Sequence, residues 1–155
     1  MSAEDGANPS LSLQDLLNEE QAEERRERDA ARRAEAEKAA KFEMERKHYE
    51  QRALTEDDRA LFLRRIRTEF LQHEREAMLA TFPSDYCADG GRHINHQLEG
   101  WENELPGYAR RIYDFWYSDL RLGGFGFDAR IMSFTPEGFP RDVGLFVTWP
   151  DAHQM

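Results

Sequence analysis

The sequence of 155 residues contains a single cysteine, Cys87, and has no apolar run long enough to span a membrane. One cysteine excludes an intramolecular disulfide, and it excludes zinc sites that take several cysteines from one chain. A membrane-spanning helix would need about 20 predominantly apolar residues. The acidic start of the chain, residues 1–5, also lacks the basic and apolar regions of a signal peptide. We therefore expect a cytoplasmic protein with no membrane-spanning segment.

Basic side chains are outnumbered, because 21 Lys and Arg residues face 31 Asp and Glu residues and give a formal net charge of -10. Binding to nucleic-acid phosphates depends on Lys and Arg side chains that release counterions. Direct nucleic-acid binding is therefore disfavoured. The same acidity raises another hypothesis, in which the protein imitates nucleic acid and inhibits a DNA-binding protein. Against this, the acids of the N-terminal part are interleaved with bases, which weakens a phosphate-like field.

Aromatic residues are scarce in the first 60 positions, where Phe42 and Tyr49 are the only two. The hydrophobic core therefore has to come from the rest of the chain, which is long enough for one small core. We divide the sequence into a disordered tail over residues 1–10, a charged helical arm over residues 11–54 and a small α+β domain over residues 55–155. The tail is assigned because its Gly, Asn and Pro residues follow no apolar pattern.

The arm opens with a short apolar stripe. Ser12 is a preferred helix-capping residue, and Asp15 stands three residues after it. Leu13, Leu16 and Leu17 then fall on one face of the predicted helix. An amphipathic helix can bind a partner by laying such a face into an apolar groove.

Residues 18–41 contain no large apolar side chain and cannot bury a helix face. They can still form a solvated helix, because Ala, Glu, Arg and Lys favour helix and acids often stand four residues before bases, as in Glu24 and Arg28. A solvated single helix and plain disorder both stay open for this stretch. Phe42 and Tyr49 follow at a spacing that would let the end of the arm contact an apolar surface.

A second helix is predicted where the aromatic part of the chain begins. Thr55 and Asp58 match the capping box, with an aspartate in place of the usual glutamate. Apolar residues repeat at helical spacing over residues 63–80, which predicts one helix over residues 56–80 that ends before Pro83. The same apolar band could pair two chains, so a homo-oligomer is also considered.

The remainder of the chain mixes helix and strand signals. Residues 84–105 carry paired glycines and no sustained period, which predicts a long loop. Proline opens a further helix over residues 106–120, and two glycines end it. Alternating apolar residues at 125–131 and β-forming residues at 143–149 predict two strands. The fold class is therefore α+β, with two main helices packed on an antiparallel β-hairpin or small sheet.

Three potential metal ligands lie within ten residues in the predicted loop. Cys87, His93 and His96 could occupy three positions of a tetrahedral zinc or other transition-metal site, with Asp89, Glu99 or water as the fourth ligand. The same residues suggest a cysteine nucleophile activated by one of the two imidazoles. Alternatively, the cysteine packs as a small hydrophobic side chain.

The leading hypothesis is a non-enzymatic protein-interaction or assembly factor that docks a partner through its arm. Its contact residues are predicted to be Leu13, Leu16, Leu17, Phe42 and Tyr49, and it needs no cofactor. The alternatives are a small metal-binding or cysteine-dependent enzyme and an acidic inhibitor that mimics nucleic acid. No GxGxxG, GxxxxGK[ST], HExxH or GxSxG fingerprint favours an enzyme of a common class.

Overall fold

The computed structural model describes residues 10–151, in which the chain divides into two compact units at the Glu45–Arg46 boundary. The predicted tail, residues 1–10, lies outside the described residues except for Ser10. In the described range, no helix combines the length and the apolar character that crossing a membrane requires. The two units are described separately below.

Helix α2 (Leu13–Gln51) is one continuous helix that includes residues 18–41, so the helical alternative for this stretch is confirmed. It begins as predicted, because the Ser12 hydroxyl accepts a hydrogen bond from the Asp15 backbone N–H at 3.0 Å. None of its residues is fully buried. The first unit therefore depends on helix propensity and on local ion pairs, such as those of Arg26 with Glu23 and of Arg32 with Asp29.

The last turn of α2, residues 46–51, belongs to the second unit and contributes to its core. The Tyr49 ring lies among three other aromatic rings, with centroid distances of 5.8 Å to Phe82, 5.2 Å to Tyr86 and 5.7 Å to Tyr108. Such contacts stabilise beyond the burial of apolar area alone. The α+β body of the protein thus begins before residue 55.

Helix α5 (Gly107–Phe115) starts directly against this turn. The Gly107 N–H donates to the Glu50 carboxylate at 2.9 Å, and the Arg111 guanidinium donates to the Glu50 carbonyl at 2.9 Å. The N–H group at the start of α5 and the carbonyl group at the end of α2 have no partner within their own helices, and each is hydrogen-bonded by a side chain of the other helix. A Cβ atom at Gly107 would lie 2.3 Å from Glu50 Cα, so a side chain at this position does not fit.

Helix α3 (Glu56–Leu71) has the predicted capping box, in which Thr55 and Asp58 each accept a hydrogen bond from the other's backbone N–H. Phe62 and Ile66 face the core. The helix ends at Leu71, so the prediction of one helix over residues 56–80 is wrong for its last third, and the band considered for pairing two chains is not one helical face.

After the C-cap residue Gln72, the chain leaves helix α3 at His73, which takes the left-handed conformation at φ 66°. The Glu74 N–H donates to the Glu69 carbonyl at 3.0 Å and the His73 N–H donates to the Phe70 carbonyl at 3.1 Å, which together form a Schellman motif. Glycine usually occupies this position. Because a histidine stands here instead, no signal in the sequence marked the end of the helix at this point. His73 is exposed and does not continue the apolar face.

Strand β1 (Glu76–Pro83) replaces the last third of the predicted helix. Ala77, Leu79 and Phe82 are buried while Met78 and Thr81 are exposed, with a bulge at Leu79, where the register shifts between Met78 and Ala80. This alternation is typical of a strand with one face on the core.

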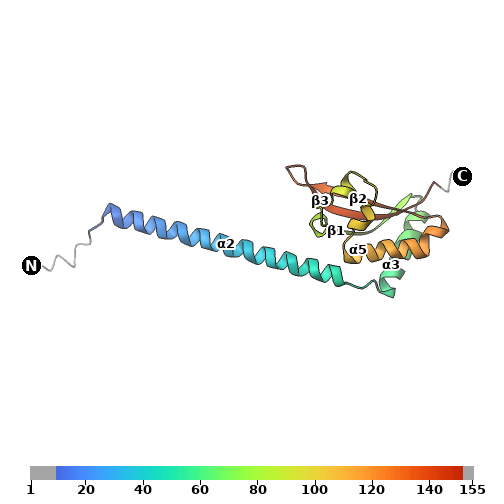
Figure 1. Cartoon of the computed structure of the whole chain (residues 1–155), viewed down its shortest axis with the longest axis horizontal. Helices are drawn as coiled ribbons and strands as arrows, with labels where there is room; N and C mark the ends of the chain where they lie inside the picture. Colours follow the sequence, from blue (N-terminus) through green and yellow to red (C-terminus); the bar gives the residue numbers. More distant parts are fainter. Residues whose placement is uncertain (1–9, 152–155) are drawn as a thin grey trace, which may run out of the picture. The chain divides into compact units, whose positions relative to one another are not determined.

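The sheet has three antiparallel strands in the order β1-β3-β2, formed with β2 (Gly126–Phe134) and β3 (Pro140–Thr148). Two of these strands were predicted and β1 was not. Helices α3 and α5 lie on one side of the sheet (Figure 1), where Ile66 and Ile112 pack with Val143 in one core. The α+β class with a small sheet is confirmed.

Short helical turns fill the remaining connections. The predicted loop over residues 84–105 contains three short helical turns, η1 (Ser84–Tyr86), α4 (Arg92–Asn95) and η2 (Trp101–Glu104). After α5, the chain continues through the π-helical turn η3 (Trp116–Leu120) and the 3-10 turn η4 (Arg121–Gly123). Gly124 then ends the helical segment at φ 101°, as the paired glycines predicted.

We predict that Gly107→Ala lowers the free energy of unfolding by about 1–3 kcal/mol, because the added methyl overlaps the Glu50 backbone. Urea denaturation of the full chain measures the change. Gly123→Ala is the matched control, since its Cβ would meet the nearest atoms of Phe125 at 3.8 Å, an ordinary contact. Equal stability of the two variants would contradict the proposed close approach.

Candidate functional site

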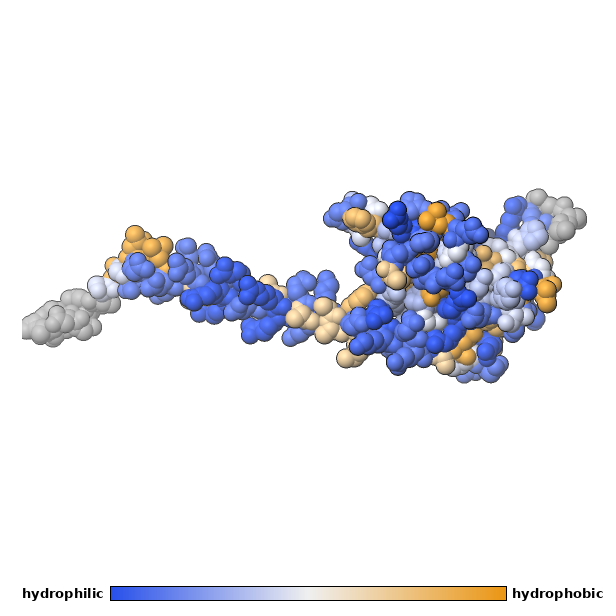
Figure 2. Space-filling view, in the orientation of Figure 1, coloured by the Kyte–Doolittle hydropathy of each residue, from blue (hydrophilic) through white to orange (hydrophobic). Residues whose placement is uncertain are grey.

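The first candidate surface is the leucine stripe, defined as Leu13, Leu16 and Leu17. Their exposed fractions are 73%, 43% and 41%, which is high for large aliphatic side chains. Figure 2 shows hydrophobic colour gathered at the start of α2, next to a long hydrophilic stretch of the same helix. The stripe is therefore an apolar surface within an otherwise polar helix segment.

Acidic side chains surround the leucine stripe. From Leu13 to Glu24 the chain carries five acids and no base. These acids are Asp15, Glu19, Glu20, Glu23 and Glu24. The first base along the helix is Arg25, where a basic stretch begins. The start of α2 therefore combines an apolar stripe with negative charge, which complements an apolar groove with a basic rim.

The other two predicted contact residues lie elsewhere on α2. Phe42 is partly buried and stands far along the helix from the stripe. Tyr49 is partly buried and packs against the core of the second unit, and its hydroxyl is buried with no hydrogen-bond partner among the described residues. Burial, followed by the nearby Tyr108, raises the pKa of Tyr49 above its usual range. Tyr49 therefore stabilises the fold, and we leave it out of the proposed contact surface.

Cys87 lies in the core, with 5% of its surface exposed. Burial is the main cause that raises the pKa of its thiol to about 12, and the charges of Asp89, Glu104 and Asp85 raise it further. A thiol with this pKa is protonated at neutral pH and is a poor nucleophile and a poor metal ligand. The structure therefore favours the packing role for this side chain.

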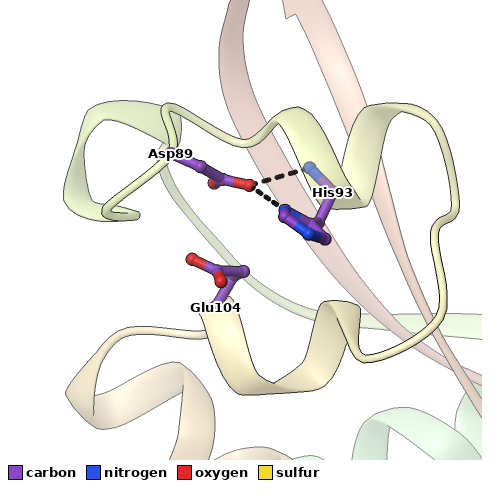
Figure 3. Close-up of side chains that lie close together, drawn as sticks. All are labelled: Asp89, His93 and Glu104. Atoms are coloured by element: carbon purple, nitrogen blue, oxygen red, sulfur yellow. Dashed lines mark hydrogen bonds and ion pairs between the residues drawn. The ribbon is translucent and has the colours of Figure 1, made fainter.

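Three other side chains come together near Cys87: Asp89, His93 and Glu104 (Figure 3). One ligand atom from each lies within 4.8 Å of the others, and this is the one group of potential metal ligands among residues 10–151. The predicted ligands Cys87 and His96 lie outside this group, as does the alternative ligand Glu99. We name Asp89, His93 and Glu104 the carboxylate–imidazole group.

The first two members of the group are held in place by hydrogen bonds. The Asp89 carboxylate accepts from the Gly91 N–H at 3.0 Å and from the His93 N–H at 2.9 Å, and it lies 2.5 Å from His93 Nδ1. Burial alone would raise the pKa of Asp89, but the hydrogen bonds from His93 and Gly91 lower it. Asp89 is therefore a carboxylate whose orientation is set before any ligand binds.

Sequence reasoning identified two members of this group, His93 as a ligand and Asp89 as an alternative fourth ligand, because both lie in the short segment that also carries Cys87 and His96. It missed Glu104, which stands eleven residues beyond His93 at the end of η2. No local pattern marks this glutamate, and the folding back of η2 toward α4 brings it close. Glu99, the other acid that was considered as a fourth ligand, is exposed.

We predict that Cys87 in the native protein reacts with a disulfide reagent at pH 8 on the order of 1000-fold more slowly than in urea. The reason is the raised pKa of the buried thiol, which leaves little thiolate in the folded state. Since the chain has one cysteine, absorbance of the released thiol reports this site alone. Equal rates before and after unfolding would contradict the burial of the thiol.

Comparison with known proteins found no matching family model, no matching curated protein and no matching solved structure. The function therefore has to be argued from the side chains of this chain.

Proposed function

We propose that this protein is a non-enzymatic interaction factor, in which α2 binds a partner protein through the leucine stripe. The observation that carries the proposal is the exposure of Leu13, Leu16 and Leu17 on a helix with no other large apolar side chain before Phe42. Isolated exposed leucines are common on protein surfaces, but three on one face of a polar helix form a contact surface.

Burial of the leucine stripe would contribute favourably to the free energy of binding. Full burial of one leucine side chain contributes about 1.5–3 kcal/mol, and three such side chains can offset part of the entropy lost on association. The helix is already formed in the free chain, so little of this energy is used to order the backbone. A helix that lies in an apolar groove is the recognition mode that fits this arrangement.

The acids around the stripe define the partner further. Five carboxylates accompany the leucines between Leu13 and Glu24, so a partner groove lined by Lys or Arg would attract this end of the helix. Such attraction increases the association rate at low salt and is screened at high salt. The partner class is therefore a protein with an apolar groove and a basic rim.

The cysteine-dependent enzyme is a weaker alternative. Its nucleophile would be Cys87, which is buried and carries a thiol with a raised pKa. Neither His93 nor His96 joins it in the group of potential ligands. No geometric observation favours this alternative over an interaction protein.

The stripe can be tested by affinity purification with the full chain and the variant Leu13→Ala/Leu16→Ala/Leu17→Ala. Alanine keeps the helix propensity, so binding changes while helix content does not. We expect the dissociation constant of the recovered partner to rise by at least about 100-fold, since three buried leucines are lost. Titration with the purified partner measures the change.

The matched control is Met44→Ala, which removes an apolar side chain of the same helix that is 73% exposed but lies outside the stripe. This variant should bind as the original chain does, and binding of the original chain should weaken as salt increases. Unchanged partner binding by the triple variant would refute the proposal.

A further inference from the structure

We propose that the carboxylate–imidazole group, Asp89, His93 and Glu104, binds a divalent transition metal ion, for which zinc has the best-suited chemistry. The proposal concerns the second unit and does not depend on the leucine stripe. It replaces the ligand set expected from the sequence, because the fold brings together one imidazole and two carboxylates.

The donor atoms match this class of metal. Zinc accepts imidazole nitrogen and carboxylate oxygen, whereas magnesium and calcium prefer oxygen donors alone. Three protein ligands with water in the fourth position form a common zinc arrangement. Ligand atoms of a tetrahedral zinc site lie about 3.4 Å apart, given bonds of about 2.0–2.2 Å. The group is already within 4.8 Å, so small side-chain rotations close it around an ion.

The charges of the group also favour a cation. The carboxylates of Asp89 and Glu104 lie close to a single imidazole, that of His93, and all three side chains are partly buried. Within residues 10–151, the Glu104 side chain makes no hydrogen bond and no ion pair, although its charge acts on Cys87. Carboxylates held this close repel each other unless a cation or a proton lies between them. A divalent ion would compensate both.

The ligands stand on two turns that are anchored separately. On the first turn, Asp89 is oriented by backbone N–H groups of Gly91 and His93. Gly91 itself adopts φ 87° and packs so closely that an added Cβ would lie 3.2 Å from Ser84 Cβ. A left-handed and crowded position strongly favours glycine, so this turn has a restricted shape.

The second turn, η2, carries Glu104 and is tied to helix α5. The Arg110 guanidinium donates to the Glu102 carbonyl at 2.8 Å and approaches the Asn103 side-chain oxygen at 3.4 Å. Because Arg110 belongs to α5, which packs in the core, these bonds fix η2 and with it the position of Glu104. The site is thus pre-organised on both sides, which lowers the cost of binding a metal ion.

Solvent has access to the group. Asp89 lines a groove of about 480 Å³ together with Arg92, Asn95 and His96. Arg92, the basic residue among those that line the groove, is exposed. A metal ion can therefore reach the carboxylate without unfolding of the domain.

The test is competition for zinc between the full chain and a chromophoric chelator, with zinc chloride as the probe. We expect one tightly held zinc per chain and a rise in melting temperature on zinc addition, because a ligand of the native state stabilises it. Magnesium chloride should give neither effect. X-ray absorption of the zinc complex should show nitrogen and oxygen neighbours and no sulfur.

Glu104→Gln is the decisive variant, because this side chain makes no hydrogen bond within residues 10–151 that folding would lose. Mutation of a residue that only hydrogen-bonds to a metal ligand already weakens metal affinity by about 10–100-fold. Loss of a ligand itself should therefore weaken zinc binding by at least about 100-fold. His93→Gln should behave in the same way. Circular dichroism before zinc addition confirms that both variants are folded.

His96→Gln is the matched control, since this exposed histidine lies three residues from His93 and outside the group. It should bind zinc as the original chain does, and so should the triple leucine variant. Failure of the original chain to bind one zinc would overturn the proposal, as would unchanged binding by Glu104→Gln. Sulfur in the absorption spectrum would assign the metal to Cys87 instead and would also overturn it.

Discussion

The close contact between the last turn of α2 and the first turn of α5 is the constraint on which the second unit depends. The two backbones meet at Glu50 and Gly107, where a single methyl group would not fit. Two reciprocal hydrogen bonds pair the end of one helix with the start of the other, since the Glu50 carboxylate accepts from Gly107 and its carbonyl accepts from Arg111. Tyr49 then reaches the aromatic core. Because α5 also holds η2 through Arg110, the position of Glu104 follows from the same packing.

Local chemistry predicted the parts of the fold whose signals are local. The caps at Ser12 and Thr55 and the stop at Gly124 are short-range hydrogen-bond or backbone preferences, and all three are confirmed. Strand β1 was missed because Ala77 and Ala80 continue the helical period of the apolar residues before them. In addition, a histidine takes the left-handed position that glycine usually marks. The burial of Leu79 and Phe82 identifies the strand only after the sheet is known.

The candidate sites also divide into features that a local sequence pattern predicts and features that depend on tertiary packing. The leucine stripe is a local pattern on one helix, and its exposure agrees with the polarity of the residues that follow it. Two members of the carboxylate–imidazole group were named from the sequence, His93 as a ligand and Asp89 as an alternative fourth ligand, because they lie close together along the chain. The approach of Glu104 and the burial of Cys87 depend on how the turns between β1 and α5 pack together. Residue types and spacing therefore indicated the region of this group, whereas Cys87 and His96, two of the three ligands expected from the sequence, lie outside it.

The two candidate sites differ in how closely they are linked to stability. The stripe lies on a helix segment that has no buried residue, so its leucines contribute to no core and can change without unfolding the second unit. The carboxylate–imidazole group is bonded to turns that the core positions, so its geometry changes when the packing of α5 changes. A loss of binding at the stripe can thus be separated from misfolding. In the carboxylate–imidazole group, a loss of binding can be separated from misfolding at Glu104, because its side chain takes no part in the hydrogen bonds that hold the two turns.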